Sequence, residues 1–147
     1  MAALVLFNQF FQNVGRGVHN LHTNALKMAL TNSAPNIATQ ALLSDITQIA
    51  NGNGYTTGGF TLSGITFTLD SAVAELIASD LVITASGGTM ATWRYPVLYD
   101  DTPSSPLDPL IGYLDVGSGI SLADGQSRTL DFSATLGLLR LGAGTVS

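Results

Sequence analysis

Residues 23–31 read Thr23-Asn-Ala-Leu-Lys-Met-Ala-Leu-Thr31, and this stretch carries the first clear sign of the fold. Leu26, Met28 and Leu30 recur at every second position, with smaller or charged side chains between them. Side chains two residues apart lie on the same face of a β-strand. The pattern therefore predicts a half-buried strand. Asn32-Ser-Ala-Pro35 should end it, because proline has no N–H to give to a neighbouring strand and the polar residues before it favour a turn.

Downstream of residue 59 the chain gives the same kind of signal repeatedly. Residues 60–69 predict a strand in which Ser63-Gly64 forms a bulge. Further runs rich in β-forming residues are separated by turn-forming glycine, proline and aspartate: Ser79–Ala85, Met90–Tyr99, Leu110–Val116, Arg128–Phe132 and Ala134–Leu141. The sequence thus predicts a mainly β fold, an antiparallel β-sandwich or barrel of a jelly-roll-like kind.

One short α-helix is expected near residues 39–50. Thr39 would cap its start, and Asn51-Gly52 would supply the left-handed stop at its end. The apolar residues between these ends recur at intervals of three and four, which is the helical period: Leu42, Leu43, Ile46, Ile49 and Ala50.

Residues 1–16 give no regular pattern. Their apolar side chains are spaced in a way that fits neither a strand nor a helix well. We expect an N-terminal arm or an edge element here. No proline-, serine- or charge-rich linker interrupts the rest, so residues 17–147 should form a single β-rich domain.

Composition excludes several classes of protein. Of the 147 residues, 46% are hydrophobic and only 10% are charged, so 42 Thr, Ser, Asn and Gln residues must cover most of the surface. A disordered chain would be less hydrophobic and more charged. No apolar run is long enough for a membrane-spanning helix. The net charge of −5 disfavours nucleic-acid binding. Charge is also unevenly distributed: residues 1–69 carry a net +1 and residues 70–147 a net −6.

The residues that could carry chemistry do not form a recognisable site. There is no cysteine, which excludes thiolate metal sites and cysteine nucleophiles. His19 and His22 have no acid near them in sequence and are expected at the surface or in an interface. Asp100, Asp101, Asp108 and Asp115 could ligate calcium, but no EF-hand pattern is present and turns explain them better. The glycine-rich pieces lack the context of a phosphate-binding loop, and no nucleophile elbow occurs. We expect no enzyme, no resident metal and no cofactor.

Three aromatic residues form a candidate binding platform. Trp93, Tyr95 and Tyr99 would lie on one face of the strand at residues 90–99. Such a stripe could bind a glycan or a peptide, although aromatic side chains more often fill the core. Arg94 beside them is expected to form a buried or interfacial ion pair with an aspartate of the acidic half.

Several long ordered motifs resemble a family of small virion structural proteins of tailed bacteriophages. The resemblance covers most of residues 16–132 and rests on Gly17-Val-His-Asn-Leu21, Asn24-Ala-Leu-Lys-Met-Ala-Leu-Thr-Asn-Ser-Ala-Pro35, Ser44-Asp-Ile-Thr-Gln-Ile-Ala-Asn-Gly-Asn-Gly-Tyr-Thr-Thr-Gly-Gly59, Ala85-Ser-Gly-Gly88, Arg94-Tyr-Pro-Val-Leu-Tyr99, Asp108-Pro-Leu-Ile-Gly-Tyr113, Asp115-Val-Gly-Ser-Gly119 and Leu122-Ala-Asp-Gly125. It implies a capsid decoration or cement protein that binds the major capsid protein, sits on the capsid surface and is assembled in the cytoplasm of the bacterial host.

Composition agrees with extensive permanent contact between subunits. A surface poor in charge has little like-charge repulsion and few long side chains to immobilise. Apolar residues at both ends would be a liability on a lone monomer, so we expect a homo-oligomer, with a trimer favoured. The candidate interface residues are Leu4, Leu6, Phe7, Phe10, Phe11, Leu138, Leu139 and Leu141.

Two alternatives share much of this reasoning. A tail tube or tail-tip subunit would have the same β-rich fold and apolar ends. A receptor- or glycan-binding module would instead use the face of Trp93, Tyr95 and Tyr99, and it requires those rings to be exposed.

Overall fold

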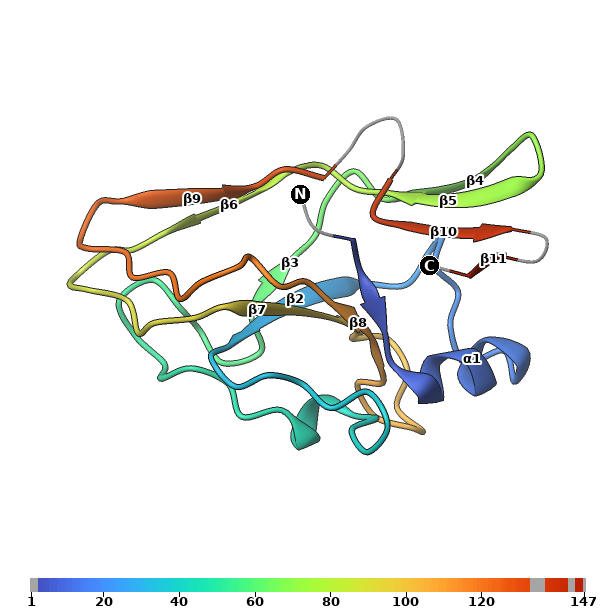
Figure 1. Cartoon of the computed structure of the whole chain (residues 1–147), viewed down its shortest axis with the longest axis horizontal. Helices are drawn as coiled ribbons and strands as arrows, with labels where there is room; N and C mark the ends of the chain where they lie inside the picture. Colours follow the sequence, from blue (N-terminus) through green and yellow to red (C-terminus); the bar gives the residue numbers. More distant parts are fainter. Residues whose placement is uncertain (1–2, 133–136, 143–144, 147) are drawn as a thin grey trace.

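The computed structural model describes residues 3–132, 137–142 and 145–146 (Figure 1). The fold is mainly β, with antiparallel sheets and one short α-helix. The strands in the described part of the chain form no closed barrel. The predicted fold class is therefore confirmed in its open, layered form.

One layer is a five-stranded sheet in the order β1-β8-β7-β2-β3. Its central pair is fully matched, from Leu26 opposite Asp100 to Thr31 opposite Tyr95. The strands are β1 (Val5–Leu6), β2 (Leu26–Thr31), β3 (Phe60–Thr61), β7 (Tyr95–Asp100) and β8 (Leu110–Tyr113).

The second layer lies above the first in Figure 1 and is a long antiparallel ribbon with a break in it. The chain runs from β5 directly into β6, and their partners β10 and β9 run back alongside them. At the break, the backbone N–H of Phe132 donates to Asp80 Oδ1 at 2.8 Å. The elements of this layer are β4 (Thr66–Asp70), β5 (Val73–Ile77), β6 (Leu81–Thr84), β9 (Ser127–Leu130), β10 (Leu139–Gly142) and β11 (Thr145–Val146).

The central strands of the five-stranded sheet, β2, β7 and β8, are mostly buried on both faces. Leu26, Met28 and Leu30 of β2 belong to the larger hydrophobic cluster, whereas Ala29 belongs to a second, smaller one. In Figure 1 the segment from residue 32 to residue 51 covers the face of this sheet that is turned away from the second layer. The strand predicted at residues 23–31 is therefore real over Leu26–Thr31, but it is central and every residue except Lys27 is buried, where a half-buried strand was expected.

The helix predicted near residues 39–50 is wrong. This segment contains only one 3₁₀ turn, η1 (Leu43–Asp45). Asp45 Oδ2 accepts the backbone N–H groups of Ala41 and Leu42 at 2.9 and 3.0 Å, and the N–H of Ile49 donates to the carbonyl of Leu30 in β2. Because an aspartate side chain can compete with the backbone for hydrogen bonds, the segment satisfies its N–H groups without a helix.

The α-helix lies instead at the N-terminus, as α1 (Asn8–Gly15). It follows β1, which pairs with β8 at one edge of the five-stranded sheet. The N–H of Phe7 donates to the carbonyl of Ile111, and the N–H of Asn8 donates to that of Ile37. Of the two expectations for residues 1–16, the described part forms an edge element.

Two further predictions about strands need correction. The stretch at residues 60–69 is split between β3 and β4, which belong to different sheets. Ser63-Gly64 is therefore part of the crossing between the two layers and not a bulge within one strand. Gly64 takes a φ of +63° there. β5 was not expected at all. The predicted strand at residues 134–141 lies partly outside the described residues, and β10 occupies its end.

Candidate functional site

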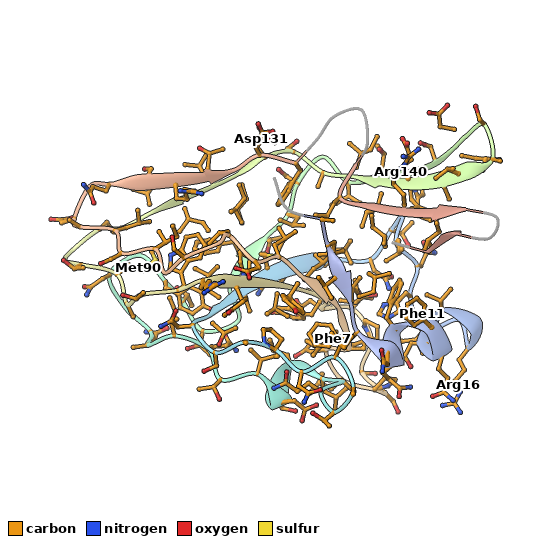
Figure 2. The ribbon with its side chains drawn as sticks, in the orientation of Figure 1. Phe7, Phe11, Arg16, Met90, Asp131 and Arg140 are labelled. Carbon is orange, nitrogen blue, oxygen red and sulfur yellow. The ribbon has the colours of Figure 1, made fainter. Side chains whose placement is uncertain are left out.

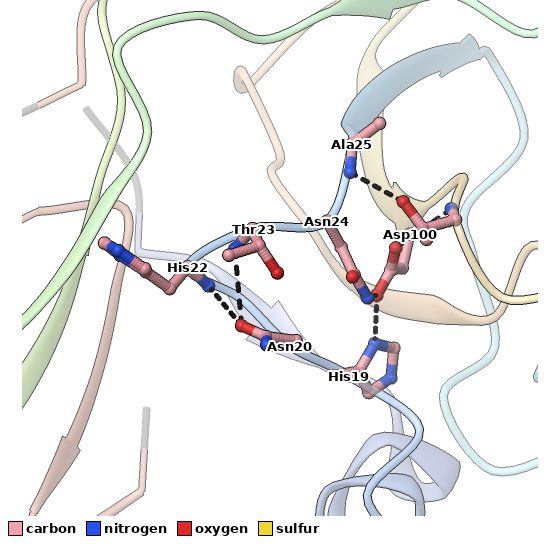
Figure 3. A network of polar contacts seen from close by, with 8 residues as sticks. His19, Asn20, His22, Thr23, Asn24, Ala25 and Asp100 are labelled. Carbon is pink, nitrogen blue, oxygen red and sulfur yellow. Dashed lines mark hydrogen bonds and ion pairs between the residues drawn. The ribbon is translucent and has the colours of Figure 1, made fainter.

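A buried polar network joins the segment after α1 to the end of β7 (Figure 3). His19 Nδ1 lies 2.9 Å from Asp100 Oδ2, and both side chains are at most 1% exposed. Asn24 Nδ2 donates to the same oxygen at 2.8 Å, and the N–H of Thr102 donates to Asp100 Oδ1 at 3.1 Å. The expectation of a surface histidine is therefore wrong for His19, whereas His22 is exposed.

The four aspartates proposed as calcium ligands are dispersed. Asp100 is committed to the network around His19, and Asp115 binds Arg94. Asp101 and Asp108 remain together; burial, with the nearby charge of Asp101, raises the pKa of Asp108. The described residues contain no group of three or more side chains of the kinds that could hold a metal ion.

The ion pair expected for Arg94 is present. Its Nε and Nη2 donate to the two carboxylate oxygens of Asp115 at 2.8 and 3.0 Å. These hydrogen bonds lower the pKa of Asp115. Both side chains are more than one third exposed, so this is a surface pair on the rim of the sheet.

The aromatic platform is not formed. Trp93 and Tyr99 are buried, and they belong to different hydrophobic clusters on opposite faces of the five-stranded sheet. The hydroxyl of Tyr99 donates to the carbonyl of Gly58, and burial raises its pKa. Tyr95 is half-buried against Tyr113, with ring centroids 6.0 Å apart. The main support for a glycan-binding surface at these residues is therefore lost.

The apolar ends of the chain are mostly core. Phe10 packs on the ring of His19 at 5.2 Å. The premise that the ends are exposed on a monomer is therefore wrong, because six of the eight candidate interface residues are buried: Leu4, Leu6, Phe7, Phe10, Leu138 and Leu139. Phe11 is 46% exposed and Leu141 is half-buried.

Other apolar side chains reach the surface instead, and no sequence pattern singled them out. Leu69, on β4, is the most exposed of them at 74%. Leu107, before the turn at Asp108, is 61% exposed, and Val82 on β6 is 55% exposed. Val14 lies one turn beyond Phe11 on α1 and is 42% exposed. These residues lie on α1, β4 and β6 and in one loop.

A pocket of about 570 Å³ opens beside α1. Asn13 is only 3% exposed, and its Nδ2 has no hydrogen-bond partner among the described residues. Arg16 caps the end of the helix and projects at the periphery of the molecule (Figure 2). The lining residues include no carboxylate: Gln9, Asn13, Arg16, Val18, Ala41, Leu42, Ser105 and Pro106. Sequence reasoning missed this pocket, because its parts come from three distant segments.

Comparisons of the chain with protein-family models, with curated proteins and with solved structures find no match. Among the described residues, none of the helices combines the length and apolar character that crossing a bilayer requires. The function is therefore argued from the residues and the surface of the chain itself.

Proposed function

We propose that this protein is a structural virion subunit of a tailed bacteriophage, a capsid decoration or cement protein that bridges neighbouring capsomers. The proposal begins from the family resemblance of residues 16–132. The structural observation that carries it is that the chain has few charged side chains and that several of these are paired within the chain.

Five of the charged side chains have partners within the chain. Asp100 is fully buried against His19, and Glu75, 4% exposed, lies 3.2 Å from Arg140 across β5 and β10. Arg94 is paired with Asp115. Because only 10% of the residues are charged, uncharged polar side chains outnumber charged ones on the outer surface. Such a surface can approach another copy with little desolvation of charge and little repulsion.

The exposed apolar side chains support contacts in more than one direction. They lie on α1, on β4, on β6 and in the turn before Asp108. A subunit that touches several neighbours needs separate contact regions, whereas a protein with one partner needs one. The same surface suits self-association, and a trimer matches the threefold positions of a capsid.

The mechanism would be mechanical. A cement subunit adds contacts between capsomers, so outward pressure from packaged DNA must break more of them before the shell opens. No catalytic step is required, and the rate of particle opening on heating should fall as copies are added.

Heating intact particles beside particles that lack this protein tests the proposal. We expect the depleted particles to release DNA at a lower temperature, and purified protein to restore the temperature of the intact particles. Equal release temperatures for the two kinds of particle would contradict the proposal.

A further inference from the structure

We propose that the pocket beside α1 binds the tip of the β4–β5 hairpin of a second copy of this chain. In this contact Asp70 of one copy pairs with Arg16 of the next, and Leu69 packs on the apolar wall of the pocket. The inference rests on the self-association in the proposed function and names the surfaces that perform it.

The pocket is built to receive an anionic group. The guanidinium of Arg16 has no ion pair or side-chain hydrogen bond within the described part of the chain. The buried amide of Asn13 has an unused N–H donor, since Gln9 Nε2 occupies only its oxygen, at 3.3 Å. That Nδ2 atom is itself buried, so Arg16 is the group that can meet an incoming anion. A carboxylate pairs with arginine.

The pocket also has an apolar wall. Val18, Leu42 and Pro106 line it beside the polar groups. A small inorganic anion would leave this wall uncovered. The better fit is a carboxylate that is attached next to an exposed apolar side chain.

The hairpin tip has this combination. Asp70 is exposed and has no partner among the described residues, and its neighbour Leu69 is the most exposed large apolar side chain described. Asp70 pairs with Val73 in the ladder, so only Ser71 and Ala72 connect the strands. A loop this short holds both side chains in place at the tip, which keeps the ordering cost of binding low.

A second exposed acid, Asp131, lacks this combination. Asp131 is also exposed and without a partner in the described residues, but its neighbour Phe132 is buried in the core. It therefore presents charge alone. Figure 1 places the hairpin tip and α1 at the same end of the long axis, in different layers. Copies that meet at this end can repeat the contact around an axis, and a ring forms when the rotation between copies closes.

Charge reversal of the two partners tests the contact. Sedimentation velocity of the full-length chain over a concentration series would measure association of the wild type, of Arg16→Glu and of Asp70→Arg. We expect each single variant to weaken association at least tenfold. The double variant, and an equimolar mixture of the two single variants, should restore association because each then pairs opposite charges.

Arg128→Glu and Asp131→Arg are the matched controls, since both residues are exposed and without a partner in the described part of the chain. They should leave association within about threefold of the wild type. Circular dichroism and thermal unfolding should show that all variants fold, because the side chains that are changed lie at the surface.

The outcomes separate this inference from the proposed function. If the wild type associates and both charge reversals leave it unchanged, the inference is overturned while self-association stands. If Arg16→Glu dissociates the oligomer and Asp70→Arg does not, the hairpin is not the occupant and the inference is overturned. A monomeric wild type would overturn the inference and the self-association proposal together.

Discussion

Asp100 shows how a single buried carboxylate can hold distant segments together. Its partners come from the loop after α1 and from the turn after β7, and the residue itself is fully buried. A buried carboxylate is costly unless several donors satisfy it, as they do here. The chain separates His19 from Asp100 by 81 positions, so no local motif could have predicted the pair.

Replacing this carboxylate should be severe. Asp100→Ala leaves the side chains of His19 and Asn24 and the N–H of Thr102 without their acceptor, so we expect a loss of about 3–5 kcal/mol in the free energy of unfolding. Urea denaturation at pH 7 measures it. Asp131→Ala, at an exposed position, should change stability by less than about 0.5 kcal/mol. A loss below about 1 kcal/mol for Asp100→Ala would show that the network does not stabilise the fold.

Replacing Asp108 should stabilise the fold, in contrast to replacing Asp100. Its pKa is raised in the folded state, first by burial and then by Asp101, so its carboxylate destabilises the fold when it is ionised. Asp108→Asn keeps a residue that tolerates its φ of +48° and removes the charge. We expect a gain of at most about 0.5 kcal/mol at pH 7, because the group is largely solvated.

The effect of Asp108→Asn on stability should depend on pH. The advantage of Asp108→Asn should shrink as the pH falls through the raised pKa of Asp108. It should vanish below about pH 3.9, where the wild-type carboxyl is protonated in both states. Thermal unfolding of both proteins between pH 3 and 7 measures this. An advantage that grows as the pH falls would contradict the assigned cause.

At the scale of elements, the strands with a strict period of two were predictable and the loop over the sheet was not. β2 followed directly from Leu26, Met28 and Leu30. The apolar residues at 42–50 recur at helical intervals although no helix forms. Ile46 and Ile49 pack into two different hydrophobic clusters, on opposite faces of the sheet. Period alone cannot distinguish that arrangement from one helical face. β5 was missed because its buried Glu75 breaks the apolar pattern.

The backbone packs closely at Gly59, just before β3, but not at Gly125, so alanine should cost different amounts of stability at the two positions. A Cβ at Gly59 would overlap the carbonyl of Met28, whereas a Cβ at Gly125 would meet nothing within 4 Å. Both residues have positive φ, +82° and +85°. Gly125→Ala should therefore cost only the backbone strain of about 1–2 kcal/mol. Gly59→Ala should cost roughly 1–3 kcal/mol more from overlap with β2.

Chemical denaturation of the two alanine variants measures this difference. Equal losses would show that β3 is not held as closely against β2 as the structure describes. A larger loss for Gly125→Ala would contradict both the close packing described at Gly59 and the open space described at Gly125.

At the scale of the whole molecule, the sequence predicted the mainly β class and the scarcity of surface charge, but not the surface that would make contacts. The apolar residues near the chain ends looked like an interface because a linear pattern cannot show that β1 and β10 are covered by the rest of the fold. Val82 lies on β6, whose partner β9 is set by long-range pairing, whereas Leu69 lies in the local β4–β5 hairpin. Which side of such a strand meets solvent follows from topology and not from local composition.

In the proposed function, this chain works by contacting its neighbours on a capsid. A reconstruction of the phage particle at a resolution that traces side chains tests that claim most directly. We expect density for this fold on the outer surface of the capsid, over the junctions between capsomers. The β4–β5 tip of one copy should be seated beside α1 of the next. Density for the chain confined to the tail, or a capsid without it, would contradict the central claim.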